Sequence, residues 1–174
     1  MAALATAGEL ETHLGRSVDP DQAELMLALG SGAVRGYCGW ELARETTTFH
    51  FEGDGRSLVT LPTLELISVN QVRADGLVID IETWPIRSSR KGQLRGGCWH
   101  LGVQYEVDAV HGYDPIPDLI KLCVLDMGAR QVNNPMGLVS ATTGQVTRTW
   151  ASGSANDPTS LSALHLRLLD RYRL

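Results

Sequence analysis

The stretch Trp99-His-Leu-Gly-Val-Gln-Tyr-Glu-Val-Asp108 places an apolar residue at every second position. Side chains of a β-strand point alternately to its two faces, so this period of two predicts a strand with one buried face. Earlier in the chain, Leu64–Arg73 and Leu77–Glu82 flank Ala74-Asp75-Gly76. An Asp-Gly pair between two apolar runs is typical of a tight hairpin turn. The middle of the chain is therefore predicted to be antiparallel β-sheet.

The β pattern begins near Thr46. Phe49 and Phe51 alternate with His50, and Gly53-Asp54-Gly55 predicts a turn that leads to a second strand at Ser57–Leu61. The region thus predicts two successive hairpins followed by a last strand, all within a β insertion at about residues 46–109.

Two helices are predicted before the β region. Thr6 and Glu9 match the Ser/Thr-x-x-Glu pattern of a capping box, so a short helix should begin there and end at Gly15. Asp19-Pro20 supplies an N-cap and a first-turn proline to a longer helix that reaches Tyr37. The chain is therefore helical up to the β region.

Helical spacing returns after the β region. Pro117 begins a third helix, Asn133-Asn134-Pro135 ends it, and Asp157-Pro158 is predicted to begin a fourth. The connection from Met136 to Pro158 is rich in Gly, Ser, Thr and Asn and is predicted to be irregular. The expected fold class is α+β, a bundle of about four helices with an inserted antiparallel β subdomain, in a single domain of residues 1–174. Its third helix should bury one stripe, namely Ile120, Cys123, Val124 and Met127.

Composition limits the possible partners. A net charge of -5 argues against a protein that grips nucleic acid, because such binding needs clustered lysine and arginine. No apolar run approaches the roughly 20 residues that span a bilayer, so no membrane partner is expected. Cys38, Cys98 and Cys123 contain no CxxC pair and are predicted to be buried thiols, not a disulfide framework or a zinc site.

The best candidate for chemistry is the group Cys98, His100, Asp108 and His111, which could build an activated nucleophile or a three-ligand metal site. Cys98 and His100 alternate with the apolar residues of the predicted strand, which favours a polar strand face over a catalytic group. The sequence also lacks the HExxH, GxSxG and phosphate-loop patterns. We therefore expect no enzyme activity, no catalytic residue, no metal and no cofactor.

Other residues indicate contacts between molecules. Gly30 and Gly36 each disfavour a helix by about 1 kcal/mol relative to alanine, which indicates close approach to another helix or another subunit. Trp150 lies in a polar stretch without an obvious core, and buried aromatic residues are frequent interface anchors. We expect a subunit interface to contain Trp150, with Val146 and Arg148, and also Gly30 and Gly36.

A basic cluster lies in Arg87-Ser-Ser-Arg-Lys91 together with Arg95. It could contact DNA phosphates or an acidic protein, but a solvated loop is favoured in a chain with a net charge of -5.

Four features together resemble the head-to-tail connector (adaptor) proteins of long-tailed bacteriophages. The features are the helix beginning Asp19-Pro-Asp-Gln-Ala-Glu-Leu, the β segment ending Tyr105-Glu-Val-Asp-Ala-Val-His-Gly-Tyr, the helix Ile116-Pro-Asp-Leu-Ile-Lys-Leu, and the ending Leu161-Ser-Ala-Leu-His-Leu-Arg-Leu-Leu-Asp-Arg-Tyr-Arg-Leu. The resemblance extends over nearly the whole chain. It implies a helical bundle assembled as a ring, commonly of twelve copies, beneath the portal protein. It also implies a place in the virion neck, with assembly in the host cytoplasm.

The resemblance further implies partners and contact residues. The partners are other copies of the chain, the portal protein, the next neck or tail protein, and genomic DNA that passes through the lumen without sequence-specific binding. A C-terminal arm at about residues 136–174 would dock on the portal through Leu161, Leu164, Leu168, Leu169, Arg171, Tyr172 and Arg173. Three alternatives stay open: another neck protein (head closure or tail-side completion), a small metal-dependent or cysteine hydrolase, and a sugar- or nucleic-acid-binding β module.

Overall fold

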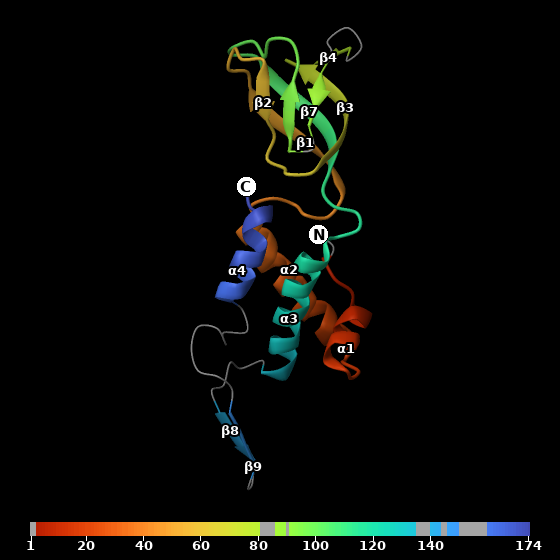
Figure 1. Ribbon diagram of the computed structural model, residues 1–174. Coiled ribbons are helices and arrows are strands. Elements are labelled where there is room, and N and C mark those ends of the chain that lie inside the picture. Colours follow the sequence, from red (N-terminus) through yellow and green to blue (C-terminus); the bar gives the residue numbers. More distant parts are fainter. Residues whose placement is uncertain (1–2, 81–85, 90, 135–139, 144–145, 150–159) are drawn as a thin grey trace. The chain divides into compact units, whose positions relative to one another are not determined.

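The computed structural model describes residues 3–80, 86–89, 91–134, 140–143, 146–149 and 160–174. The chain divides into a helical unit, residues 1–39 with 116–173, and a β unit formed mainly by residues 40–115 (Figure 1). Each unit has its own packing and is described by itself. The four helices and the antiparallel sheets confirm the predicted α+β class. Within the described residues, no helix is both long enough and apolar enough to cross a membrane.

The helical unit contains α1 (Ala7–Leu14), α2 (Pro20–Cys38), α3 (Asp118–Asn133) and α4 (Ala163–Leu169). The last of these continues as a 3-10 helix, η2 (Asp170–Tyr172).

Local capping signals explain where the first two helices begin. The Thr6 hydroxyl accepts from the Glu9 backbone N–H, and the Glu9 carboxylate accepts from the Thr6 backbone N–H, so the predicted capping box is confirmed. Asp19 caps α2 by accepting from the backbone N–H of Gln22 at 3.1 Å. The fourth helix begins later than expected. Its N-cap is Ser162, while the predicted start at Asp157-Pro158 lies outside the described residues.

Helices α2 and α3 form the main packed pair of the helical unit. Gly30 is buried at their contact, where an added Cβ would lie 3.3 Å from the Val124 carbonyl oxygen. The close approach that Gly30 indicated is therefore confirmed, and the neighbour is α3 of the same chain. The stripe predicted for α3 is fully buried: Ile120, Cys123, Val124 and Met127 are all 0% exposed.

Part of the connection between α3 and α4 is regular. Strands β8 (Ser140–Thr143) and β9 (Val146–Thr149) form an antiparallel hairpin in which Ser140 pairs with Thr149. The prediction of an irregular connection is wrong for these residues. Their threonines and valine are β-branched and favour extended backbone, and this preference outweighed the polar composition.

The β unit contains two sheets. The larger has the strand order β1 (Glu45–Glu52), β7 (Gln104–His111), β3 (Leu66–Ala74) and β4 (Leu77–Ile79). The smaller has the order β2 (Leu58–Thr60), β6 (Gln93–Arg95) and β5 (Arg87–Ser88). Both sheets contribute to one core, which is formed by Leu61, Leu66, Val72, Leu94, Trp99, Tyr105, Val107 and Ala109.

One predicted hairpin is confirmed and the other is wrong. Strands β3 and β4 pair across Asp75-Gly76, and both turn residues have positive φ, 47° and 79°. Strand β1 instead pairs with β7, with Phe49 opposite Val107, while β2 belongs to the other sheet. The connection that begins at Gly53 does not fold back on β1, because its backbone N–H groups bond to the carbonyl oxygens of Val103 and Trp99.

The strand predicted at 99–108 begins only at Gln104. Its Tyr105 and Val107 face the core as expected, and Trp99 is fully buried. Leu101, however, lies in a turn with Gly102 and is 77% exposed. The apolar residues before Gln104 therefore alternate with polar ones without forming a strand. Only the second half of the stretch, from Gln104, is the predicted strand.

The two ends of the β unit are joined to each other. The Arg44 backbone N–H donates to the Tyr113 carbonyl oxygen at 3.1 Å, and the Tyr113 N–H donates to the Leu42 carbonyl oxygen at 2.8 Å. Gly112, the residue before Tyr113, has a φ of 95°. A Cβ added to it would lie 2.3 Å from the carbonyl oxygen of Ala43. Only glycine allows this approach, so Gly112 closes the unit at its base.

Candidate functional site: assembly surfaces

The four residues weighed for chemistry are not brought together. The exposed Cys98 thiol donates to the Gly55 carbonyl oxygen at 3.4 Å, and His100 is exposed beside it in sequence, in a turn. Asp108 accepts a hydrogen bond from Thr48 at 2.5 Å. His111 faces the opposite side of β7 and is buried. Cys98 was predicted to be buried, which is wrong: it lies in an irregular segment before β7, and its side chain is exposed while that of Trp99 is buried.

His111 lies among aromatic rings at the base of the β unit. Its ring centroid is 5.1 Å from that of Phe49 and 6.4 Å from that of Trp40, and burial lowers the pKa of the imidazole. Within the described residues, no group of three or more His, Cys, Asp or Glu side chains is arranged to hold a metal ion.

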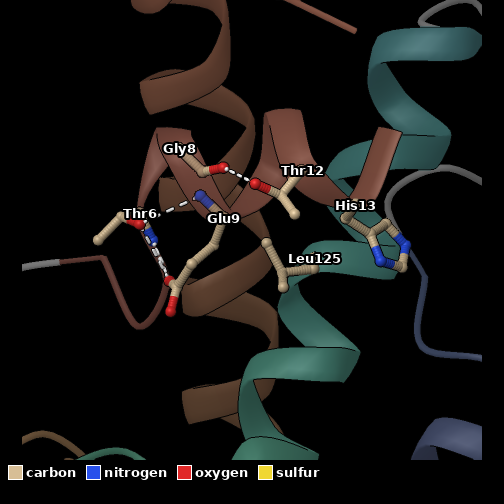
Figure 2. Close-up of a pocket in the computed structure, with 6 residues that line it drawn as sticks. All are labelled: Thr6, Gly8, Glu9, Thr12, His13 and Leu125. Carbon is tan, nitrogen blue, oxygen red and sulfur yellow. Dashed lines mark hydrogen bonds between the residues drawn. The ribbon is translucent and has the colours of Figure 1, made fainter. Parts of the chain in front are cut away.

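The helical unit has an open hollow of about 550 Å³ between α1 and α3. Figure 2 shows Glu9 turned back toward Thr6, and Thr12 bonded to the Gly8 carbonyl oxygen. Glu9 also accepts from Lys121 at 2.7 Å, and this bond is the main reason that the pKa of Glu9 is lowered. The polar groups of the hollow are thus largely engaged with one another.

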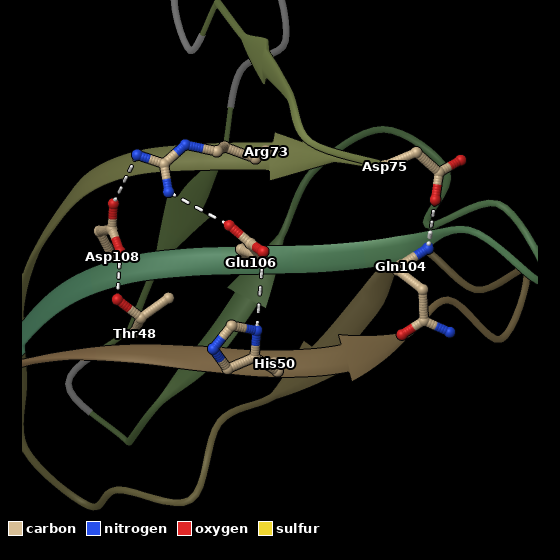
Figure 3. Close-up of polar contacts among 7 residues, drawn as sticks. All are labelled: Thr48, His50, Arg73, Asp75, Gln104, Glu106 and Asp108. Atoms are coloured by element: carbon tan, nitrogen blue, oxygen red, sulfur yellow. Dashed lines mark hydrogen bonds and ion pairs between the residues drawn. The ribbon is translucent and has the colours of Figure 1, made fainter.

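The solvent face of the larger sheet carries a charge network (Figure 3). Arg73 on β3 lies 3.2 Å from Glu106 and 3.5 Å from Asp108, both on β7. His50 on β1 lies 3.9 Å from Glu106 on its other side. The two carboxylates are therefore held by partners within the sheet, and they form a cross-strand ladder and not an open acid pair.

The basic cluster adopts a defined arrangement in the smaller sheet. Arg87 on β5 stands directly opposite Arg95 on β6, and both side chains are exposed. Neither arginine has an ion-pair partner among the described residues. Like charges that face each other across strands destabilise a sheet, so this pairing is unfavourable for the smaller sheet.

A buried histidine anchors α4. The Ser162 hydroxyl accepts from the His165 backbone N–H at 3.2 Å, while the Ser162 N–H donates to His165 Nδ1 at 3.4 Å. Because Nδ1 is an acceptor, the ring proton lies on Nε2, which donates to Asp126 Oδ2 at 2.7 Å. Arg130 pairs with the same carboxylate at 2.5 Å. The hydrogen bond from His165 is the main cause of the lowered pKa of Asp126.

The residues predicted to contact the portal divide between two faces of this C-terminal segment. Leu169 is 0% exposed and, like His165, is buried inside the helical unit. Leu164 is 64% exposed, and Arg171 and Arg173 are also exposed. The remaining three residues, Leu161, Leu168 and Tyr172, are half-buried. Tyr37 on α2 contacts the last turn in two ways. Its hydroxyl donates to Asp170, and the Arg173 guanidinium lies 5.1 Å from the centroid of its ring.

The residues predicted to lie in a subunit interface are in different environments. Gly36 is exposed on α2, and an added Cβ would meet no atom within 4 Å, unlike at the buried Gly30. Val146 and Arg148 lie on β9, and Trp150 lies outside the described residues.

Helix α2 carries an apolar surface that was not predicted from the sequence. We call it the α2 face, and it consists of the exposed residues Leu25, Ala28, Leu29, Gly32 and Gly36. Leu25 and Leu29 are 56% and 51% exposed. They lie on the opposite side of the helix from Leu27 and Val34, which are buried. The spacing of the leucines was a usable signal, but α2 is apolar on both sides and the sequence alone does not tell which side is inside.

The fold is shared with chains of solved particle structures. No family profile and no curated protein matches the sequence. A chain in a structure described as the neck of an empty gene transfer agent particle, computed with C6 symmetry, has a TM-score of 0.63 at 15% identity. A chain in the virion of a native gene transfer agent particle has a TM-score of 0.66 at 13% identity. Each alignment covers 98% of this chain and 89% of the other.

Proposed function

We propose that this chain is a non-enzymatic structural subunit of the neck of a tailed-phage-like particle. The observation that carries the proposal is the likeness over 98% of the chain to a subunit of a gene transfer agent neck. It agrees with the resemblance to head-to-tail connectors, which rests on the order of the helices and the β insertion.

Within the neck, we assign the chain to the connector position. Copies form a closed ring beneath the portal, and DNA passes through its lumen. A ring of twelve is compatible with the six-fold symmetry applied to the related neck. An acidic chain with a net charge of -5 suits a conduit, because it does not hold phosphate groups strongly.

The C-terminal segment of the helical unit is the proposed portal contact. The bonds of His165 hold α4 in place, and Leu169 stabilises it from inside, so exposed residues near the chain end are presented on a fixed support. Arg173 and the half-buried Tyr172 are part of this contact.

The test is the mass of the purified protein, alone and mixed with a candidate portal protein, by native mass spectrometry. We expect a ring or portal-bound copies, and loss of portal binding when the chain is truncated after Ser160. Capture by a tail-side neck protein and not by the portal would support the alternative of a head-closure or tail-side completion protein. A monomer that binds neither would overturn the proposal.

A further inference from the structure

Unpaired acidic groups border the α2 face. Asp21 and Glu24 are exposed on α2 just before Leu25, and neither has an ion-pair partner in the described part of the chain. The helix dipole favours Asp21 in the first turn, but its effect fades by Glu24. The best complement to an exposed apolar surface with acidic groups at one end is an apolar surface whose basic groups lie opposite those acids.

The exposed side of α4 has this complementary character. Leu164, Arg167 and Arg171 share one side of the segment, which we call the α4 face, opposite the buried His165 and Leu169. Leu164 is 64% exposed, and neither arginine forms an ion pair within the described residues. The α4 face is thus an exposed leucine followed by two cations without an ion-pair partner in the described part of the chain, and the Arg171 guanidinium also lies 5.1 Å from the centroid of the Tyr172 ring.

We propose that the α4 face of one copy packs antiparallel on the α2 face of the next copy, with Leu164 between Leu25 and Leu29. The spacing of the charges fits this register. Ala28, at the centre of the α2 face, follows Glu24 and Asp21 by roughly 6 and 10.5 Å along the helix axis. Leu164 precedes Arg167 by roughly 4.5 Å along α4, and it precedes Arg171, which lies in the 3-10 helix η2, by roughly 11.5 Å. With Leu164 seated over Ala28, Arg167 meets Glu24 and Arg171 meets Asp21.

This contact joins two different surfaces, so each copy offers one face to each neighbour. Such a heterologous contact closes into a ring when the rotation between copies permits. The inference rests on the proposed ring and names the surfaces that form it. It assigns Leu164 and Arg171 to the neighbouring copy, and it leaves Tyr172 and Arg173 for the portal.

Charge exchange tests the contact. Asp21→Arg/Glu24→Arg makes both faces basic, and Arg167→Glu/Arg171→Glu makes both acidic, so each variant alone should lose assembly. In a mixture of the two variants, every contact between a basic face and an acidic face can form again, so rings of alternating copies should assemble. The quadruple variant, in which the charges of the two faces are exchanged, should form rings without a second species. All four substituted residues are exposed, and circular dichroism and the midpoint of urea unfolding show whether each variant is folded. Assembly by either double variant alone, or no recovery on mixing, would overturn the inference.

Thiol trapping separates this contact from the ring itself. In a Cys98→Ser background, Leu29→Cys mixed with Leu164→Cys should give several-fold more disulfide-linked dimer than Leu29→Cys mixed with Leu77→Cys. The control residue is 75% exposed and lies in the β unit. Trapping without ring formation would support the contact and count against the ring. Rings that show neither trapping nor charge sensitivity would keep the proposed function and overturn this contact.

Discussion

The imidazole of His165 on α4 donates through Nε2 to Asp126 on α3 at 2.7 Å, although the two residues are 39 positions apart in the chain. The bond connects a seven-residue helix to the helical unit. Helices this short are not stable alone in water, so α4 depends on this contact and on Leu169.

Replacing His165 should loosen the C-terminal segment. His165→Ala removes a buried hydrogen bond to a carboxylate together with half of the capping box, and we expect a loss of about 1–3 kcal/mol in unfolding free energy. Urea denaturation followed by circular dichroism measures it. His13→Ala, an exposed histidine of the same unit, is the matched control and should change stability by less than about 0.5 kcal/mol. Equal effects would mean that the bond contributes nothing.

Asp126 should make the stability depend on acid pH. Its pKa is lowered from 3.8 in the folded protein, chiefly by the His165 hydrogen bond. The ionised carboxylate therefore adds stability above the unfolded value near pH 3.8, and this stability is lost as the pH falls through the lower folded pKa. Asp126→Asn should be less stable than the parent at pH 6, and the difference should shrink toward pH 2. A constant difference over this range would contradict the assignment.

The three cysteines should differ sharply in reactivity. Burial raises the pKa of Cys38 and of Cys123 to about 11, whereas Cys98 is exposed in a turn. Iodoacetamide at pH 8 should modify Cys98 first and label the other two only after denaturation, because the thiolate is the reactive form. Peptide mass spectrometry identifies the modified thiol. Cys98→Ser should remove the fast phase, and fast labelling of Cys123 would show that the helical core opens.

Two glycines of α2 should respond differently to alanine. Gly36→Ala meets no atom within 4 Å and should gain up to about 1 kcal/mol of helix propensity. Gly30→Ala places a methyl group 3.3 Å from the Val124 carbonyl oxygen, so strain between α2 and α3 offsets that gain. Urea midpoints should rank Gly36→Ala above Gly30→Ala. The reverse order would contradict the packing of the α2 and α3 pair.

The arginine pair of the smaller sheet should be destabilising at low salt. Arg95→Gln removes a like charge directly opposite Arg87 and should raise stability by about 0.2–1 kcal/mol, less at high ionic strength. Arg56→Gln is the control with the opposite expected sign. Arg56 lies 3.5 Å from Asp54, so this substitution removes an attractive pair and should lower the stability of the protein slightly. Thermal unfolding at two salt concentrations compares them. Salt-independent changes would show that charge is not the cause.

Elements encoded by neighbouring residues were predictable. The capping box of Thr6 and Glu9 and the Asp75-Gly76 turn act over three or four positions, and both were confirmed. Strand partners depend on residues far apart, and β1 pairs with β7 across more than 50 positions, so the hairpin expected at Gly53-Asp54-Gly55 was wrong. Period-two alternation showed that strands exist but not which ones pair.

The inward side of α4 shows the same limit. The resemblance placed Leu164, Leu168 and Leu169 in one contact with the portal, yet Leu169 and the neighbouring His165 are buried inside the helical unit. A histidine is buried there because Asp126 and Ser162 satisfy both of its ring nitrogens. No pattern within residues 160–174 could reveal a partner on α3.

The backbone hydrogen bonds that join Leu42 and Arg44 to Tyr113 have a consequence for how this protein can change during evolution. A segment whose first and last residues already touch can be lengthened, shortened or exchanged as a cassette, because the chain on either side meets the same two adjacent attachment points. Natural variation in size among proteins that share this fold should therefore concentrate between Trp40 and Pro115. The same property makes this stretch the place to graft a foreign module.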